Sequence, residues 1–175
     1  MNHGKALKQI IEGIQEQVRT EGVPVLVDGK GTVELLNKVY TICYKEAIDT
    51  DSIAQSMSQY YEEKGLDLQG LQELEKDEYQ KIFDELTIKF SYFDNDLHSR
   101  RVLWTDDCCI SMVHYLVRNN TIYCYFHLRS SDIVYKLFSD LNLIHRITRR
   151  LQDKLGIYNT IIYCNAHSFH EIVLK

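Results

Sequence analysis

Apolar positions repeat at helical spacing in two stretches of the chain, which is typical of helices buried along one face. Between them, a helix is expected to begin at a cap, Asp49 or Asp51, and to run through Tyr61 to Gly65. Gly156 marks the end of the last helix. The periodic residues are Leu7, Ile10, Ile11, Ile14 and Val18 in the first stretch and Leu137, Leu141, Ile144, Leu151 and Leu155 in the second.

Short runs of β-branched and aromatic residues predict strands in the remaining segments. The turn residues Asp28-Gly29 separate the first two runs, and Asn119-Asn120 joins two runs as a hairpin. Residues 62–85 are charged, and we expect a solvated helix or connection there. The expected strands cover 24–27, 33–36, 39–42, 87–92, a segment opening at Arg100, 110–117, 121–128 and 157–164.

Because strands alternate with long helices, the sequence predicts an α/β (α+β) fold, in which a sheet is packed by helices. The length of 175 residues suits one domain, 1–175, that buries most of its apolar surface. Neither an internal repeat nor a low-complexity linker interrupts the chain.

Charge and cysteine content exclude several functional classes. The formal charge is −5 and the basic residues form no sustained run, so nonspecific nucleic-acid binding is not expected. No apolar run reaches membrane-span length and no signal peptide opens the chain, so we expect a cytoplasmic protein without membrane contact. Five cysteines without a Cys-x-x-Cys pair indicate reduced thiols and no zinc site.

The candidate catalytic and binding residues lie at one end of the predicted hairpin. Antiparallel pairing places Cys109, ahead of the first strand, near Arg129-Ser130, at the end of the second. A thiol nucleophile would then face a phosphate anchor, because arginine donates two parallel charge-assisted hydrogen bonds and serine adds a neutral donor. The alternatives are that Arg129 caps a surface strand end and that Cys109 is a buried apolar residue.

The segment from Cys109 to Asp132 resembles, without a gap, the core of the thymidylate synthases and the related deoxycytidylate hydroxymethylases. In that superfamily a Pro-Pro-Cys-His nucleophile precedes a strand, a turn, a second strand and Arg-Ser-x-Asp. Cys124 falls where the family often has a second cysteine, and Asp140 takes the asparagine position of its Gly-x-Pro-Phe-Asn turn. The resemblance, strongest over residues 96–170, implies a thymidylate synthase-like single domain, divergent and shortened.

Two further segments extend this resemblance. His167, within Asn165-Ala166-His167-Ser168-Phe169, keeps the histidine of the Gly-Asp-x-His-x-Tyr strand that holds the sugar, while Phe169 replaces the tyrosine. Ser99-Arg100-Arg101 resembles the Ser-Arg-Arg segment whose arginines reach the nucleotide phosphate of the partner subunit. The resemblance and a sheet face without an obvious cover therefore imply a homodimer.

The function implied is a pyrimidine nucleoside monophosphate C5 hydroxymethyl- or methyltransferase with methylenetetrahydrofolate as the carbon donor. Cys109 would add to carbon 6 of the base and Asp132 would assist catalysis. Arg129, Ser130, Arg100 and Arg101 would bind the phosphate, and His167 would bind the sugar 3′ hydroxyl. Asp140 favours cytosine, because a carboxylate accepts from the exocyclic amine.

Other interpretations stay open at several of these positions. Ser139 or Asp140 could cap a helix, Asp132 could pair with Arg129 or cap a turn, and Cys108 is a second candidate nucleophile.

The chain also departs from the family pattern. It lacks both prolines and the histidine around the nucleophile, and the spacing from Arg101 to Cys109 is shorter. A C-terminal segment that closes over folate is not found before Lys175, and Glu62 and Glu63 are the candidates for the catalytic glutamate. The second function is therefore a catalytically degenerate module that binds a pyrimidine nucleotide or another protein.

Overall fold

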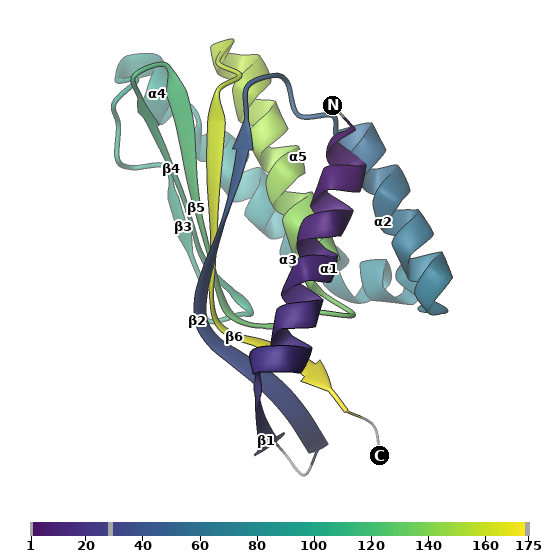
Figure 1. Ribbon diagram of the computed structural model, residues 1–175. Helices are drawn as coiled ribbons and strands as arrows, with labels where there is room; N and C mark the ends of the chain where they lie inside the picture. The colour runs from purple at the N-terminus through teal and green to yellow at the C-terminus, as the bar shows by residue number, and fades with distance from the viewer. Residues whose placement is uncertain (1, 28–29, 174–175) are drawn as a thin grey trace.

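The computed structural model describes residues 2–27 and 30–173, a mixed α/β domain in which helices pack on one sheet (Figure 1). In chain order its elements are α1 (His3–Glu21), β1 (Val23–Val27), β2 (Lys30–Tyr44), α2 (Thr50–Lys64), α3 (Leu68–Lys89), α4 (Tyr92–Asn95), β3 (Leu103–Thr105), β4 (Ile110–Arg118), β5 (Thr121–Asp132), α5 (Leu137–Leu155) and β6 (Thr160–Ile172).

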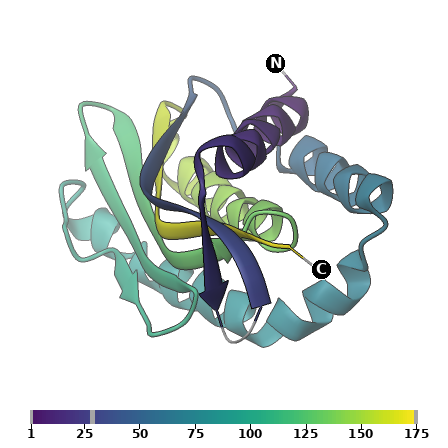
Figure 2. The ribbon, with the colours of Figure 1, turned by 60° about the horizontal axis from the view of Figure 1, so that its bottom comes forward.

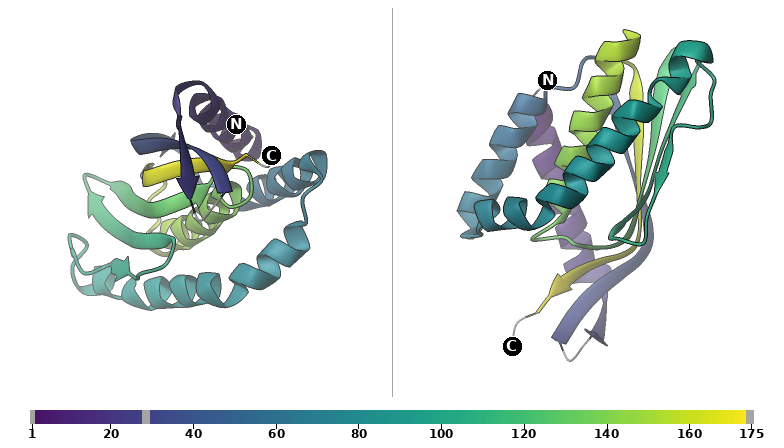
Figure 3. Two further views of the ribbon diagram at one scale, coloured as in Figure 1. Left: turned by 90° about the horizontal axis from the view of Figure 1, so that it is seen from below. Right: turned by 180° about the vertical axis from the view of Figure 1, so that it is seen from behind.

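The strands form a single sheet in the order β1-β2-β6-β5-β4-β3. Only the central pair, β5 and β6, is parallel, and helix α5 connects these two strands. The helices α1, α2, α3 and α5 all lie on one side of the sheet, as the view from behind shows (Figure 3). Helix α3 crosses beneath this layer, next to α5 (Figure 2). The predicted fold class is confirmed.

Local signals in the sequence explain where the helices begin and end. The Asp49 side chain accepts a hydrogen bond from the Ser52 amide at the start of α2, as predicted. Gly65 and Gly156 end α2 and α5 in the left-handed conformation, with φ of 65° and 66°. At the predicted hairpin, Asn119 and Asn120 both adopt positive φ, which a tight turn between twisted strands requires.

The structure corrects several predicted boundaries. The two early runs 33–36 and 39–42 form one strand, β2, and the turn predicted at residues 28 and 29 lies outside the described residues. Residues 87–92 are not extended: 87–89 end α3, residues 90 and 91 form a turn and Tyr92 begins α4, because Ile82, Leu86 and Phe90 continue one buried face. The strand predicted to open at Arg100 begins at Leu103 instead.

The sheet is sharply bent, and the burial pattern shows where. In β5 the even-numbered residues Ile122 to Leu128 face the helices, but beyond them the odd-numbered Ser131 does so. In β6 the residues that face the helices change from even-numbered, such as Ala166, to odd-numbered, such as Phe169. In β2 they change from odd-numbered, such as Leu35, to even-numbered, such as Tyr40. In each of these three strands one residue at this level therefore interrupts the alternation of side chains between the two faces.

Among β2, β6 and β5 the pairing register is unchanged across the bend, because the facing parity changes in all three strands at the same level, whereas the register of β4 with β5 shifts between Ile110 and Met112. Leu128 pairs with Ala166 and Ser130 with Ser168, on either side of the bend. The residues between the pairs, Arg129, His167 and Asn37, therefore lie side by side across β5, β6 and β2. We call these three residues the kink row; Asn37 has φ of 54° there. The bend in β2 and β6 is visible in Figure 1.

The face of the sheet opposite the helices, which we call the open face, is apolar and aromatic. Tyr125 and Tyr163 stack on it with ring centroids 5.0 Å apart, and Val39 is 57% exposed. A shallow hollow of about 220 Å³ lies here, lined by Val39, Met112, Tyr125, Phe126, His127, Tyr163 and Asn165. In the described part of the chain, none of the helices has the length and apolar character needed to cross a bilayer.

Candidate functional site

Cys109 lies at the end of the kink row. The Arg129 amide donates a hydrogen bond of 2.8 Å to the Cys109 carbonyl oxygen, which joins the segment before β4 to β5. The parallel register then places His167 beside Arg129 on β6. Three residues predicted from distant parts of the sequence thus meet at one level of the sheet, and the Cys109 side chain is partly exposed there.

The neighbouring Cys108 is held in a different environment. Its thiol donates to the Ile110 carbonyl oxygen at 2.9 Å, and burial together with the Glu78 carboxylate raises its pKa to about 12. A thiol that stays protonated is a poor nucleophile. Of the two adjacent cysteines, Cys109 is therefore the better candidate.

Arg129 and Ser130 face solvent at the bend. Arg129 is exposed, and no ion pair engages it among the described residues. Ser130 lines a cavity of about 270 Å³ together with Lys30, Ser168 and His170. The hydroxyl oxygen of Ser168 is buried there without a hydrogen-bond partner among the described residues. This end of the sheet can therefore offer hydroxyl and cationic donors to an anion.

His167 contacts a second histidine rather than a carboxylate. Its ring lies edge-on against His127, with centroids 4.6 Å apart, and the Ser111 hydroxyl is 2.8 Å from His127 Nδ1. Burial and the neighbouring His167 lower the pKa of His127. Phe169, at the position of the family tyrosine, packs in the core against Tyr40, so it lies away from this group.

Asp132 caps a turn. Its Oδ1 accepts hydrogen bonds from the Val134 and Tyr135 amides, both at 2.9 Å. Of the interpretations left open by the sequence, the turn cap is the one the contacts support, and it leaves Oδ2 as the remaining acceptor.

Asp140 belongs to a group that we call the buried polar cluster: Glu75, Tyr79, Ser131, Lys136, Ser139 and Asp140. The Tyr79 hydroxyl donates to Asp140 Oδ1 at 2.5 Å, and the Ser131 hydroxyl donates to Oδ2 at 3.2 Å. Asp140 does not cap α5, because that helix begins at Leu137 with Lys136 in the cap position. The alternative role of Ser139 or Asp140 as helix cap is therefore wrong.

Burial dominates the electrostatics of this cluster. It raises the pKa of Asp140 to about 7, against the opposing effects of Tyr79 and Lys136. Burial also raises the pKa of Tyr79, and the Asp140 carboxylate adds to that shift. Near neutral pH the Asp140 carboxyl is therefore divided between its protonated and ionised forms.

Lys136 connects the cluster to Cys109. Its Nζ lies 3.2 Å from Glu75 Oε1, and Glu75 Oε2 accepts from the Ser139 hydroxyl at 2.9 Å. Although burial disfavours the ammonium ion, the carboxylates of Asp140 and Glu75 raise the pKa of Lys136 to about 12, and Cys109 contributes to the same shift. A fixed positive charge thus stands near the candidate nucleophile.

Arg100 and Arg101 lie away from the kink row within one chain. The Arg100 carbonyl contacts His114 Nε2 at 3.2 Å, several residues along β4 from Cys109, and Arg101 lies over the Tyr92 ring. Glu63 is equally remote, because it pairs with Lys8 between α2 and α1.

Sequence reasoning missed Glu75, Tyr79 and Lys136. The signal available was the four-residue spacing of Glu75 and Tyr79 on one helix and of the cap residue Lys136 and Asp140 at the start of another, which brings the members of each pair close together. That spacing does not say which helices face each other.

Among the described residues no group of His, Cys, Asp or Glu side chains is arranged to hold a metal ion, and the five cysteines are free thiols. A scan against models of known protein families finds no match for this chain. A search of curated proteins likewise finds no relative with a significant match.

Proposed function

We propose that this protein binds a pyrimidine nucleoside monophosphate at the kink row and transfers a one-carbon unit to carbon 5 of its base. The observation that carries the proposal is the meeting of Cys109, Arg129 and His167 at one level of the sheet. The resemblance to thymidylate synthases and deoxycytidylate hydroxymethylases supports it, because it assigns nucleophile, phosphate and sugar roles to these same residues.

Each residue has a chemical task in this proposal. Arg129 and Ser130 bind the phosphate, for which the exposed guanidinium supplies two parallel donors. His167 binds the sugar 3′ hydroxyl from the adjacent strand. Cys109 then stands at the end of the row, where the base would lie.

The first chemical step needs only the thiolate of Cys109. Its sulfur bonds to carbon 6 of the base, and the electron pair of the C5=C6 double bond moves through carbon 5 to the carbonyl oxygen on carbon 4 of uracil or to ring nitrogen 3 of cytosine. Carbon 5 becomes a nucleophile able to attack a one-carbon electrophile. Lys136, whose pKa is raised in part by Cys109, places a positive charge near this sulfur.

Methylenetetrahydrofolate is the donor that the resemblance implies. The nucleotide half of the proposal stands independently of the donor and is tested without it.

Asp140 would favour a cytosine base, since a carboxylate accepts a hydrogen bond from the exocyclic amine. Both of its oxygens already receive hydrogen bonds, from Tyr79 and Ser131. Reading the base therefore requires the Tyr79 hydroxyl to turn away and give its place to the ligand.

The experiment exploits the reversibility of the first step. In D₂O, addition of Cys109 to carbon 6 allows a deuteron to enter at carbon 5, and loss of the original proton followed by expulsion of the thiolate returns a deuterated base. CMP, dCMP, UMP and dUMP are each incubated with the protein, and loss of the H5 proton signal is followed by NMR. Exchange is expected for at least one of the cytidine nucleotides.

Paired cysteine variants locate the nucleophile. Cys109→Ser should abolish the exchange while the nucleotide still binds, and Cys108→Ser should leave the exchange rate within about twofold, because its thiol is held by Ile110 and stays protonated. Exchange that survives in Cys109→Ser, or binding without any exchange in the unaltered protein, would refute the enzymatic proposal.

A noncatalytic nucleotide-binding module is the second candidate. The observation in its favour is that Asp140 is buried and that both of its carboxylate oxygens already accept hydrogen bonds, from Tyr79 and Ser131. Saturable binding of a monophosphate that requires Arg129, with no H5 exchange, would select this function.

A homodimer is part of the proposal, because Arg100 and Arg101 lie too far along β4 to reach the kink row of their own chain. Two open faces packed about a two-fold axis that runs across the strands would reverse the strand direction between the copies. That arrangement carries Arg100 and Arg101 of the partner subunit toward Arg129.

A further inference from the structure

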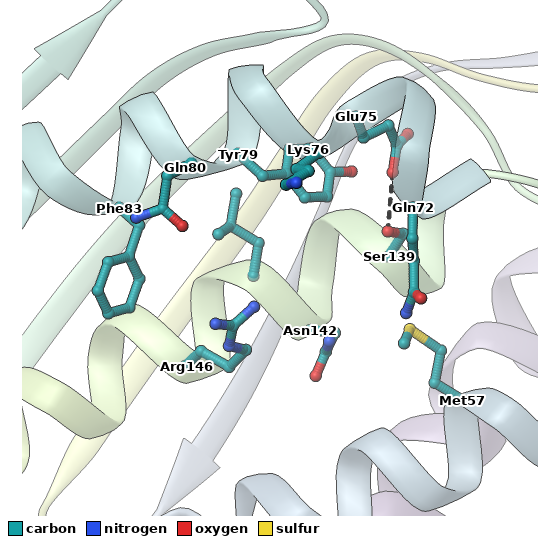
Figure 4. Close-up of a pocket in the computed structure, with 11 residues that line it drawn as sticks. Met57, Gln72, Glu75, Lys76, Tyr79, Gln80, Phe83, Ser139, Asn142 and Arg146 are labelled. Atoms are coloured by element: carbon teal, nitrogen blue, oxygen red, sulfur yellow. Dashed lines mark hydrogen bonds between the residues drawn. The ribbon is translucent and has the colours of Figure 1, made fainter. Parts of the chain in front are cut away.

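A cavity lies on the helical side of the molecule, among α2, α3 and α5 (Figure 4), and Glu75, Tyr79 and Ser139 of the buried polar cluster form part of its lining. Its volume is about 190 Å³, which is the size of a small metabolite rather than of a nucleotide. It is remote from the open face of the sheet, because the helices that line it pack on the opposite side (Figure 3).

Two buried acceptors line this cavity. Glu75 is 4% exposed; its Oε1 forms an ion pair with Lys136 Nζ at 3.2 Å and receives no further donor among the described residues. The Oδ1 atom of Asn142 is also buried without a hydrogen-bond partner among those residues. Buried acceptors with spare capacity are uncommon, because water is excluded from them and their desolvation goes uncompensated. A ligand with several N–H donors would satisfy Asn142 and add a donor to Glu75.

Two cations stand at the same cavity. Lys76 and Arg146 line it, and neither forms an ion pair with a carboxylate among the described residues. The Arg146 guanidinium lies 5.6 Å from the centre of the Phe83 ring. In Figure 4 Arg146 and Phe83 lie on one side of the view and Glu75 on the other. The cavity thus presents positive and negative groups to the same ligand.

The remaining walls are apolar. Met57 from α2, Phe83 from α3 and Leu143 from α5 line the space between the charged groups. A methionine wall adapts to aliphatic groups of different shape. An apolar side chain on the ligand would therefore be accommodated here.

We propose that this cavity binds a free α-amino acid with a medium-sized apolar side chain, such as leucine or methionine. The ammonium group donates to Glu75 and Asn142, the carboxylate pairs with Arg146 and Lys76, and the side chain packs on Met57, Phe83 and Leu143. A simple cation would lack a partner for Arg146, and a simple anion would meet the Glu75 carboxylate.

The test is calorimetric titration of the full-length protein with the twenty common amino acids, followed by two analogues of leucine. Leucine or methionine is expected to bind, with glycine and tryptophan at least tenfold weaker. Isoamylamine, which lacks the carboxylate, and 4-methylpentanoate, which lacks the ammonium group, should each bind at least tenfold more weakly than leucine. Failure of every amino acid to bind overturns the proposal.

A matched pair of arginine variants locates the site. Arg146→Ala should weaken leucine binding at least tenfold, because it removes one of the two partners of the carboxylate. Arg150→Ala, one turn further along α5 and outside this cavity, should leave the affinity within twofold. Both side chains are exposed, so both variants are expected to fold. Equal affinities in the two variants would place leucine elsewhere and refute the site.

Discussion

Asp140 is the residue whose environment makes the most direct prediction about pH. Burial raises its pKa from 3.8 to about 7, which corresponds to roughly 4 kcal/mol. A carboxyl group with a raised pKa in the folded state favours folding fully below the unfolded pKa and loses that contribution as pH rises to the folded pKa. The Asp140 contribution to the free energy of unfolding should therefore decline between pH 4 and 7.

Asp140→Asn tests this decline, because an amide keeps an acceptor for Tyr79 and can donate to Ser131 without ionising. Urea denaturation at pH 4, 5.5 and 7 should show the variant gaining stability relative to the unaltered protein as pH rises. A difference in unfolding free energy that stays constant across this range would mean that Asp140 does not titrate in the folded chain.

Arg129 should dominate nucleotide affinity, because its removal leaves the phosphate without its bidentate partner. Arg129→Ala is expected to weaken binding of the monophosphate by roughly 2–4 kcal/mol, measured by calorimetry, with the fold intact. Arg118→Ala, at the other end of the neighbouring strand β4, is the matched control and should bind normally. If nucleosides bind as tightly as their monophosphates, the proposed role of Arg129 in binding the phosphate is wrong.

At this scale the sequence predicted some neighbours and not others. Cys109 and Arg129 could be brought together because hairpin pairing follows from the apolar runs and the turn between them. Tyr79 and Asp140 could not, since they are 61 positions apart and their contact depends on how α3 crosses α5. Helix spacing identifies a face but not its partner.

Among the elements, the glycines provide a matched test of helix geometry. Gly156 ends α5 at φ of 66°, where a Cβ atom is strained even though the surrounding space is open. Gly156→Ala should therefore lower the free energy of unfolding by about 1 kcal/mol, measured by urea denaturation.

Gly13 lies on the exposed side of α1, and a Cβ atom there would meet no atom within 4 Å. Gly13→Ala should raise the free energy of unfolding by about 0.5–1 kcal/mol, because alanine has less backbone freedom to lose in a helix. If both substitutions change stability in the same direction, backbone conformation is not what distinguishes the two sites.

Helices α1, α2 and α5 and the central hairpin were predictable because their signals are local: periodic apolar faces, caps and turn residues. The segment 87–92 was not, since its β-branched and aromatic residues favour a strand while Leu86 and Phe90 complete a buried helical face. Tertiary packing decided between the two. The bend in the sheet also escaped prediction. A break in the alternation of buried and exposed residues within one strand indicates a bend of the sheet only when the neighbouring strands break at the same level, and the sequence alone does not align the strands.

For the whole molecule, the open face should hold two copies together. It combines the exposed apolar side chain of Val39 with the stacked rings of Tyr125 and Tyr163, and such contiguous patches are typical of interfaces. Light scattering should give a dimer for the unaltered protein. Val39→Glu should shift it toward monomer, because a charge would be buried without a partner.

Leu74→Glu serves as the control, since Leu74 is 86% exposed on α3, on the helical side of the molecule. It should leave the dimer unchanged. The proposed dimer would be refuted if the protein is a monomer at every concentration, or if the two substitutions change the oligomeric state equally. Arg100 and Arg101 could then not bind the phosphate held by a partner subunit.

The aligned breaks in side-chain alternation at the kink row restrict how the chain tolerates length changes. Deleting Asn37 alone would move every residue on one side of it to the opposite face of β2, so apolar side chains would turn to solvent. The same holds for deleting Arg129 in β5 or His167 in β6. Removing one residue from β2, β5 and β6 together would let side chains alternate between the two faces along the whole length of these strands. The three strands would then run straight through this level. Insertions and deletions at this level are therefore expected to be tolerated only in matched sets across the strands.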